Sequence, residues 1–333
     1  VLAARGRTHH ANNCFDCAQA ECALHAPALR LRAQARTVVL LDETWPEFWT
    51  YLHERLPDAL VYTRERSRFT TLKRAVSMRL ARTPSSKRAA HLLGSGAIAE
   101  ELARRTPYHS RHWIVAQTYL PALWRSGVLG GRTFDVFMTR LPMRHLQQSL
   151  DRAASVHPDD ATLRDFRADE RMVDAELEAL EAAGEVITVH QRVADLYPRK
   201  TTVLPFAASA VFARQTTGHA VLFPGPNLAR KGAHEVAEAL RGSDHQLLVL
   251  DARNLCIFKG VRHKVGPLDW SEVRAVLAPS FVDDCPRLLA EALQRGIPVI
   301  TTAASGLSPH PLVELVNEGS VDSIRDAVER CVR

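Results

Sequence analysis

Short apolar runs alternate with amphipathic segments along most of this 333-residue chain, and this alternation is the strongest constraint on its fold. Runs with strand character lie at 37–43, 59–63, 91–94, 113–117, 134–139, 184–190, 201–206, 220–225, 245–251, 275–280 and 298–302. Apolar residues recur with helical spacing at 68–82, 96–105, 143–156, 169–183 and 233–240. The alternation predicts an α/β protein with doubly wound parallel sheets.

The apolar runs fall into two series, which predict two Rossmann-like domains. A chain of this length has room for two domains of ordinary size. We expect the boundary near 198–210 and assign 1–200 to the first domain and 201–333 to the second. Ligands of open α/β sheets bind outside the carboxyl ends of the strands, so the cleft between the domains is the expected binding site.

Composition excludes several classes of protein. The chain contains no run of about 20 apolar residues, so no membrane span is expected. No secretory signal is visible and the six cysteines suggest no disulfide framework, which indicates a cytoplasmic protein. The net charge of +6 is spread along the chain and favours anionic ligands. The basic stretch at 64–88 fits a solvated helix face as well as a binding surface, so no nucleic-acid partner is expected.

The segment 278–302 reads APSFVDDCPRLLAEALQRGIPVITT and predicts a helix with one carboxylate before it and another within it. Pro286 suits the first turn of a helix, where a missing N–H costs little. Asp283 precedes this helix and Glu291 follows eight positions later, within the second turn. A short apolar strand comes next, so both carboxylates are expected beside a polyhydroxylated ligand at the edge of a parallel sheet.

A second segment, at 221–232, has the pattern of a phosphate site. Its sequence VLFPGPNLARKG predicts a strand, a glycine loop containing Gly225 and a turn before the helix at 233–240. Arg230 and Lys231 then lie at the N-terminus of that helix, where free N–H groups and the helix dipole favour phosphate. The alternative is an exposed basic turn, although positive charge is unfavourable at that end of a helix.

Together the two segments resemble retaining glycosyltransferases of family four, which have the GT-B fold of two facing Rossmann-like domains. The matching positions are Pro279, Ser280, Asp283, Pro286, Glu291, Ala292, Gly296, Pro298, Val299 and Ile300 in one segment and Lys231 in the other. Asp283 stands where the family usually has glutamate, and Pro226 stands where it usually has arginine. Either Arg230 substitutes for that arginine or the phosphate clamp is weaker.

The resemblance implies transfer of a sugar from a nucleotide sugar to an acceptor, with retention of anomeric configuration and no required metal. Arg230 and Lys231 would stabilise the leaving diphosphate, and Asp283, or Asp284 in its place, would contact the transferred sugar. Glu291 would bind the ribose of the donor. Further donor contacts are expected from Gly225, Asp284, Ser305, Gly306, Leu307 and Val265.

Structural roles are the alternatives at several of these positions. Asp283 would equally suit a helix N-cap, and the residues at 265–268 and 305–307 would equally suit plain turns. In the first domain the family has a polar residue near the acceptor, and this chain has no clear counterpart. The candidates are His9, His10, Gln117, Thr118 and Arg140.

Four zinc-type ligands lie close together near the start of the chain. They are Cys14, Cys17, Cys22 and His25. Their spacing fits no common zinc module, so we expect either a structural zinc or a metal-free loop beside the cleft.

Other functions compete with sugar transfer. One is a non-catalytic protein that binds nucleotide sugars or carbohydrates on the same scaffold, and another is an epimerase. A nicotinamide dehydrogenase is disfavoured because no Gly-x-Gly-x-x-Gly follows a strand. The family's second domain usually ends in a helix that returns to the first, and the absence of that helix before Arg333 suggests a truncated chain or a reduced domain. The sequence identifies neither the base, the sugar, the acceptor nor the oligomeric state.

Overall fold

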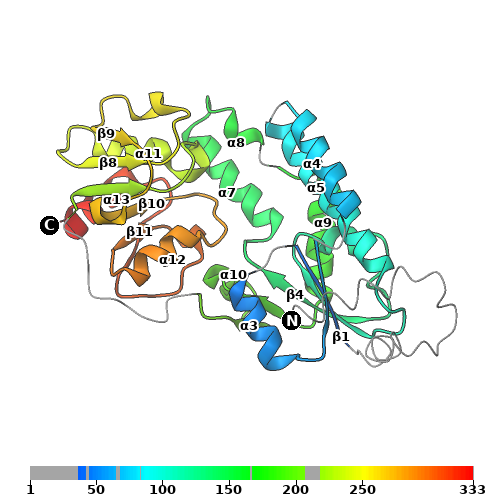
Figure 1. Cartoon of the computed structure of the whole chain (residues 1–333). Helices are drawn as coiled ribbons and strands as arrows, with labels where there is room; N and C mark the ends of the chain where they lie inside the picture. The colour runs from blue at the N-terminus through cyan, green and yellow to red at the C-terminus, as the bar shows by residue number, and fades with distance from the viewer. Residues whose placement is uncertain are drawn as a thin grey trace.

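In the computed structural model, the described residues form two six-stranded parallel sheets, each with helices packed against it (Figure 1). The structure describes residues 37–42, 45–64, 68–82, 84–165, 167–206 and 218–332. All recorded strand pairings are parallel, which confirms the predicted α/β class. The first sheet and its helices are called the first half below, and the second sheet and its helices the second half.

The first half contains strands β1 (Thr37–Leu41), β2 (Leu60–Thr63), β3 (His112–Ala116), β4 (Thr133–Met138), β5 (Val186–Thr188) and β6 (Thr201–Val203). Its helices are α3 (Pro46–Arg55), α4 (Arg68–Leu80), α5 (Pro84–Arg104), α6 (Leu120–Arg125), α7 (Met143–Val156), α8 (Thr162–Asp165), α9 (Glu170–Ala182) and α10 (Gln191–Leu196). The strand order is β2-β1-β3-β4-β5-β6, so the direction of winding reverses between β1 and β3.

The second half contains strands β7 (Ala220–Phe223), β8 (Gln246–Val249), β9 (His263–Val265), β10 (Val273–Ala278), β11 (Val299–Thr301) and β12 (Val313–Leu315). Its helices are α11 (Ala233–Leu240), α12 (Arg287–Gln294) and α13 (Val321–Val332), with short 3₁₀ turns η2 (Ala229–Lys231), η3 (Leu255–Phe258), η4 (Trp270–Glu272) and η5 (Ala303–Ser305). The order β12-β11-β10-β7-β8-β9 reverses between β7 and β10.

Alternating side chains of each strand bury against opposite layers of helices. Val221 and Leu222 are neighbours in β7, and both are fully buried, yet they belong to different hydrophobic clusters. Val38 and Val39 of β1 divide in the same way. Because both faces of each sheet are covered, the strands appear in the sequence as continuous apolar runs, which is what made them predictable.

One predicted strand is wrong, and two strands were not predicted. Residues 91–94 lie inside α5, where Leu92 is buried and Leu93 is 71% exposed. A four-residue apolar run is too short for its periodicity to separate strand from helix. The unpredicted strands β9 and β12 are short outer strands of the second sheet and carry few apolar residues. The chain passes from the first sheet to the second between Val203 and Ala220, and the domain division after residue 200 stays a prediction.

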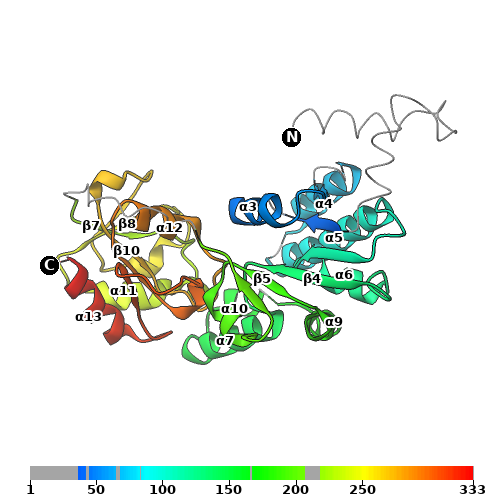
Figure 2. The same cartoon turned by 90° about the horizontal axis from the view of Figure 1, so that it is seen from below.

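Two crossed histidine–carboxylate pairs join the halves. His157, which follows α7, contacts Glu235 of α11 at 2.6 Å, and His234 of α11 contacts Asp160 at 2.9 Å. The two imidazole rings lie 4.6 Å apart. Figure 2 shows the halves side by side with α7 and α10 between them. No helix in the described part of the chain is long and apolar enough to cross a membrane.

His190 forms a second junction between the halves, at the end of β5. Its ring packs so closely against Gly306 that a Cβ added to this glycine would overlap it. The backbone N–H of Gln191 donates to the carbonyl of Gly306 at 2.8 Å. Burial of the imidazole lowers the pKa of His190 from its ordinary 6.5 to about 4.

This pKa predicts an acid-sensitive contribution to stability. A depressed histidine pKa stabilises the fold above the unfolded-state pKa, and that stability is lost as the pH falls from 6.5 to about 4. Between about pH 7 and about pH 5 the wild type should lose about 2 kcal/mol more of its free energy of unfolding than His190→Gln. Urea denaturation at several pH values measures both curves. Parallel curves would show that His190 is not held neutral by the fold.

Candidate functional site

A cavity of ≈ 260 Å³ opens at the carboxyl ends of β7 and β10. Its wall includes Phe223, the last residue of β7, and Gly225 after it, Ala278, the last residue of β10, and Asp283 after it, and Lys231. The winding of the second sheet reverses between these two strands. In open α/β sheets the loops diverge at such a point and leave a crevice for a ligand, so the position of the cavity follows from strand order.

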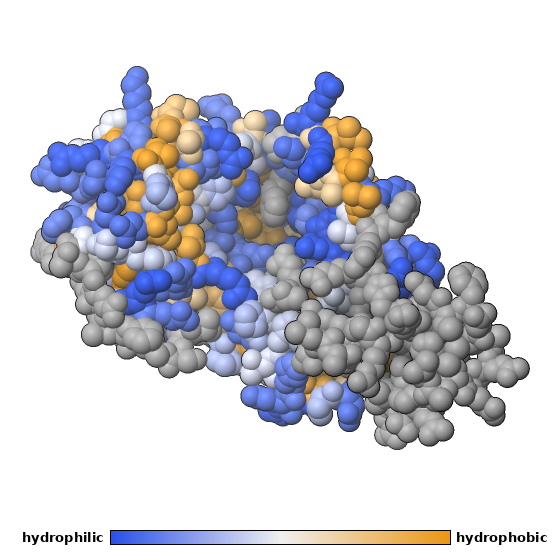
Figure 3. All heavy atoms as spheres, viewed as in Figure 1, coloured by the Kyte–Doolittle hydropathy of each residue, from blue (hydrophilic) through white to orange (hydrophobic). Residues whose placement is uncertain are grey.

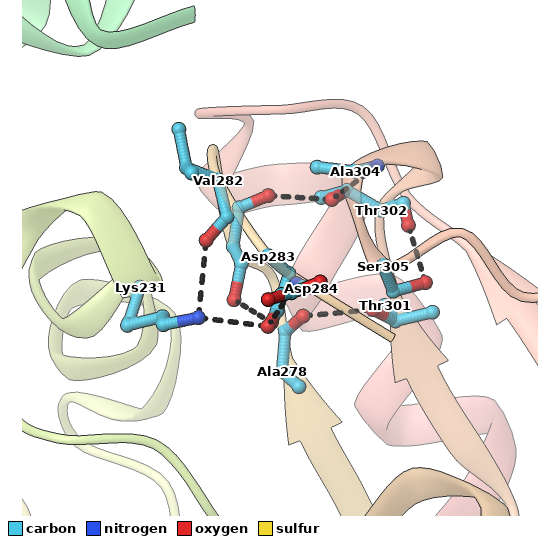
Figure 4. A network of polar contacts seen from close by, with 10 residues as sticks. Lys231, Ala278, Val282, Asp283, Asp284, Thr301, Thr302, Ala304 and Ser305 are labelled. Carbon is cyan, nitrogen blue, oxygen red and sulfur yellow. Dashed lines mark hydrogen bonds and ion pairs between the residues drawn. The ribbon is translucent and has the colours of Figure 1, made fainter. Parts of the chain in front are cut away.

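Lys231 and Asp283 meet in the wall of this cavity. Nζ of Lys231 lies 2.8 Å from Oδ1 of Asp283 and donates to the carbonyl of Val282 at 3.1 Å (Figure 4). The two side chains are 18% and 8% exposed. The structure therefore brings together two predicted catalytic residues that are 52 positions apart in the chain.

The turn that carries Lys231 depends on Gly232. This glycine has a φ of 77°, in the left-handed region that side chains disfavour. A Cβ at this position would overlap the carbonyl of Pro279 and lie 2.9 Å from its Cγ. The absence of a side chain lets η2 pack directly on the loop after β10, which is why the Lys-Gly sequence of the motif forms a tight junction.

Asp283 is held by hydrogen bonds on both oxygens. Ser280 Oγ donates to Oδ2 at 2.8 Å, and the N–H of Asp284 donates to Oδ1 at 2.9 Å. The backbone at Cys285 has a φ of 43°, and the thiol is buried, which raises its pKa well above the ordinary value. Asp283 is therefore a positioned carboxylate rather than the N-cap of α12, whose cap residue is Pro286.

Arg230 lies beside the pair but does not line the cavity. Its backbone carbonyl accepts from the N–H groups of Phe281 and Val282 at 3.0 and 3.3 Å. Burial lowers the pKa of the guanidinium, while the charges of Asp283 and Asp165 oppose that shift. Arg230 thus supplies a partly desolvated positive charge close to Asp283.

The predicted ribose ligand Glu291 has partners within the protein. Its Oε1 accepts from Trp270 Nε1 at 2.8 Å and from Arg295 Nη2 at 2.9 Å. Glu291 lies on α12 and outside the residues that line the cavity. Val265 lies on the outer strand β9, 39% exposed and also outside the lining. A role for either residue in donor binding stays a prediction.

The loop after β11 is linked to Asp283 through Ser280, which bonds to both. The sequence did not predict these hydrogen bonds. Thr302 Oγ1 donates to the carbonyl of Ser280, and Ser305 Oγ donates to the carbonyl of Thr302 at 2.9 Å. Ser305 and Leu307 are buried, and Gly306 has a φ of 74°. The hydroxyl of Ser305 is thus committed to the loop, and any contribution of this loop to phosphate binding would come from its backbone.

One wall of the cavity connects to the first half. Arg287 lines the cavity and lies 4.4 Å above the ring of Trp45, and its Nη2 is 3.5 Å from Glu47. Neither Trp45 nor Glu47 was a predicted site residue. Nothing in the local sequence marks them, because they touch a cavity residue, Arg287, only through contact between the halves.

Of the acceptor candidates in the first half, Gln117, Thr118 and Arg140 lie within the described residues. Gln117 is buried and donates to the carbonyl of Leu141 and to Glu176, so it has a structural role. Thr118 follows it, and Arg140 lies two positions after β4. The candidates His9 and His10, and the zinc-type ligands Cys14, Cys17, Cys22 and His25, lie outside the described residues. Within the described ranges no group of three or more His, Cys, Asp or Glu residues is placed to hold a metal.

Several solved structures are similar to this chain. Sucrose-phosphate synthase from Thermosynechococcus elongatus matches with a TM-score of 0.51 and 17% identity, over 72% of this chain and 68% of that chain. HepE from Anabaena in complex with UDP gives 0.48 and 13%, over 89% and 90%. The apo form of the lipopolysaccharide outer core galactosyltransferase WaaB gives 0.47 and 13%, over 89% and 90%. No protein-family model and no curated protein sequence matches the chain.

At such identities the similarity concerns the fold alone. The synthase comparison, together with two parallel sheets joined in one chain, confirms the predicted GT-B architecture.

The junction at Gly232 gives a test of how the cavity is built. Gly232→Ala should lower the free energy of unfolding by about 1–2 kcal/mol for the left-handed backbone and by about 1–3 kcal/mol more for the overlap with Pro279. Gly242→Ala is the matched control, since Gly242 has the same φ of 77° but no atom within 4 Å of an added Cβ. Urea denaturation of both variants isolates the steric part. Equal losses would mean that η2 does not pack as closely on the loop as the structure indicates.

Proposed function

We propose that this chain is a retaining glycosyltransferase that moves a sugar from a nucleotide sugar to an acceptor. The observation that carries this proposal is the pairing of Lys231 with Asp283 in a cavity at the switch point of the second sheet. A nucleotide sugar needs a cation for its diphosphate and a carboxylate for its sugar hydroxyls, and this cavity offers both. The likeness of the fold to a sucrose-phosphate synthase supports the same conclusion.

Lys231 is the group that would meet the diphosphate. Its ammonium has three N–H bonds, of which two donate to Asp283 and to the carbonyl of Val282. The third can reach a phosphate oxygen without breaking either contact. As the bond between the anomeric carbon and the diphosphate breaks, Lys231 and the nearby Arg230 would stabilise the growing negative charge. This is why no metal is required by the proposal.

Asp283 would bind the transferred sugar. Ser280 and Asp284 fix the orientation of its carboxylate, so little ordering is needed when a sugar arrives. Charge develops on the sugar ring in an oxocarbenium-like state, and a carboxylate nearby stabilises that state. Retention rests on the segment at 283–291, through its resemblance to family four.

Two further parts of the proposal concern the cellular location of the protein and a zinc site. A cytoplasmic location fits the free cysteines of the described residues, which are Cys256, Cys285 and Cys331.

A structural zinc on Cys14, Cys17, Cys22 and His25 is a separate proposal, which metal analysis of the purified protein would test.

Lys231→Met should weaken the binding of a nucleoside diphosphate at least about tenfold, because it removes the charge but keeps the aliphatic stem. Calorimetric titration with UDP, GDP and ADP first identifies the base and then compares the variants. Lys259→Met is the matched control, since Lys259 is an exposed lysine of the same half that lies outside the cavity wall.

Equal affinities in the wild type and Lys231→Met would remove the donor site from this cavity. Incubation with the corresponding nucleotide sugar then tests catalysis. Binding with neither hydrolysis nor transfer to any acceptor would favour the non-catalytic alternative.

A further inference from the structure

Four arginines of the first half surround the carboxyl edge of its sheet. They are Arg64, which follows β2, Arg74 on α4, Arg88 on α5 and Arg140, which follows β4. We call them the arginine cluster. The first sheet reverses its winding between β1 and β3, so this edge is its natural ligand crevice, as the cavity at β7 and β10 is for the second sheet.

Helices α4 and α5 pack together at this edge and hold Arg74 in place. A Cβ added to Gly94 of α5 would lie 2.6 Å from Cγ of Arg74, so the stem of Arg74 runs directly across this glycine. The Arg74 side chain is only 12% exposed. The basic stretch at 64–88 is therefore not simply a solvated helix face, which was one of the two readings of the sequence.

One carboxylate lies near two of the four arginines, and a third arginine has buried donors without a partner among the described residues. Asp42, directly after β1, lies 3.8 Å from Arg64 and 3.7 Å from Arg74, and it also accepts from the Tyr119 hydroxyl at 3.2 Å. Nε and Nη2 of Arg140 are buried without a hydrogen-bond partner among the described residues. Leaving buried donors unsatisfied is costly, which indicates that a ligand completes the site.

The nearest buried carboxylate is already engaged. Glu176 accepts from Gln117 Nε2 at 3.1 Å and from the backbone N–H of Met143. Burial raises the pKa of Glu176, while the charge of Arg140 opposes that shift. Arg140 thus acts on Glu176 through its charge, and no hydrogen bond between the two side chains is recorded among the described residues.

The pKa values of Arg88 and His91 are both lowered, in part by the positive charges of the arginine cluster. Burial, followed by the charges of Arg74, Arg88, Arg140 and Arg64, lowers the pKa of His91 to about 4. Burial, followed by the charge of Arg140, lowers the pKa of Arg88 to about 10. Like charges held this close raise each other's energy, and an anion between them would relieve that cost.

We propose that the arginine cluster binds an anionic group of the acceptor, a phosphate or a carboxylate. Guanidinium groups bind both anions through paired N–H bonds. The inference rests on the proposed function, because it names the class of acceptor for the same reaction.

The location of the cluster suits an acceptor. The charges of Arg230 and Asp284 in the second half act on Arg88, so the cluster faces the donor side of the molecule. Figure 3 shows the surface hollowed between the two halves. An anion held by the cluster would leave the rest of the acceptor free to extend toward the donor cavity.

The test measures anion binding to the full chain by calorimetric titration at constant ionic strength. The probes are inorganic phosphate, glucose 6-phosphate, glucuronate and neutral glucose, each with and without a saturating nucleoside diphosphate. Arg140→Gln should weaken the binding of the anionic probes at least about tenfold, a change of about 1.4 kcal/mol. Binding of the phosphate probes without glucuronate, or of glucuronate without the phosphate probes, would identify which anion the acceptor carries.

Matched variants separate this site from the donor site. Arg125→Gln removes an exposed arginine of the same half and should bind the probes as the wild type does. Arg64→Gln, at a side chain that is 41% exposed, is the second variant in case Arg140→Gln fails to fold. Arg140→Lys should restore part of the affinity, because it returns the charge without the planar fork.

The possible failures are distinguishable. Binding lost in Lys231→Met but kept in Arg140→Gln would place the anion in the donor cavity and overturn the inference. The absence of anion binding in the wild type would also overturn it, while nucleotide binding would leave the proposed function intact. Anion binding that depends on Arg140 in a protein that binds no nucleotide would support the site and reject the proposed function.

Discussion

The ion pair between Lys231 and Asp283 holds the second half's ligand site together. It connects the turn after β7 to the loop after β10, two segments that also meet through the Arg230 carbonyl and through the packing of Gly232 on Pro279. Removing two charges from water is costly, and such a pair is retained only where further hydrogen bonds satisfy both groups. Ser280, the N–H of Asp284 and the carbonyl of Val282 supply those bonds. The pair is therefore a positioned site rather than a general source of stability.

Strand order explains why ligand-binding residues gather where they do. Each parallel sheet reverses its winding once, and at each reversal the neighbouring loops separate. In the second sheet the cavity with Lys231 and Asp283 lies at that point, and in the first sheet Arg64 and Arg74 approach Asp42 there. The two places differ in chemistry: the cavity pairs a cation with a carboxylate, and the edge of the first sheet gathers several cations.

Contacts between the halves are both apolar and polar: two hydrophobic clusters contain residues of both halves, and the polar contacts involve titratable groups. The crossed pairs of His157 with Glu235 and of His234 with Asp160 lie on one side of the junction, and His190 packs against Gly306 at another. Arg287 joins the cavity wall to Trp45 and Glu47 of the first half. The cavity is lined by residues of the second half, and one of them, Arg287, is held by contacts to the first half.

The sequence by itself determined most strands, several of the longer helices and the identity of the paired residues. Continuous apolar runs predicted buried parallel strands, and two short motifs named Lys231 and Asp283 separately. The four-residue run at 91–94 was misassigned because such a run has no readable period. The tertiary structure alone decided that Lys231 bonds to Asp283, that Glu291 is engaged by Trp270, and that arginines far apart in the chain gather around His91. These facts depend on strand order and on the packing of loops across long separations, and local sequence patterns carry no record of either.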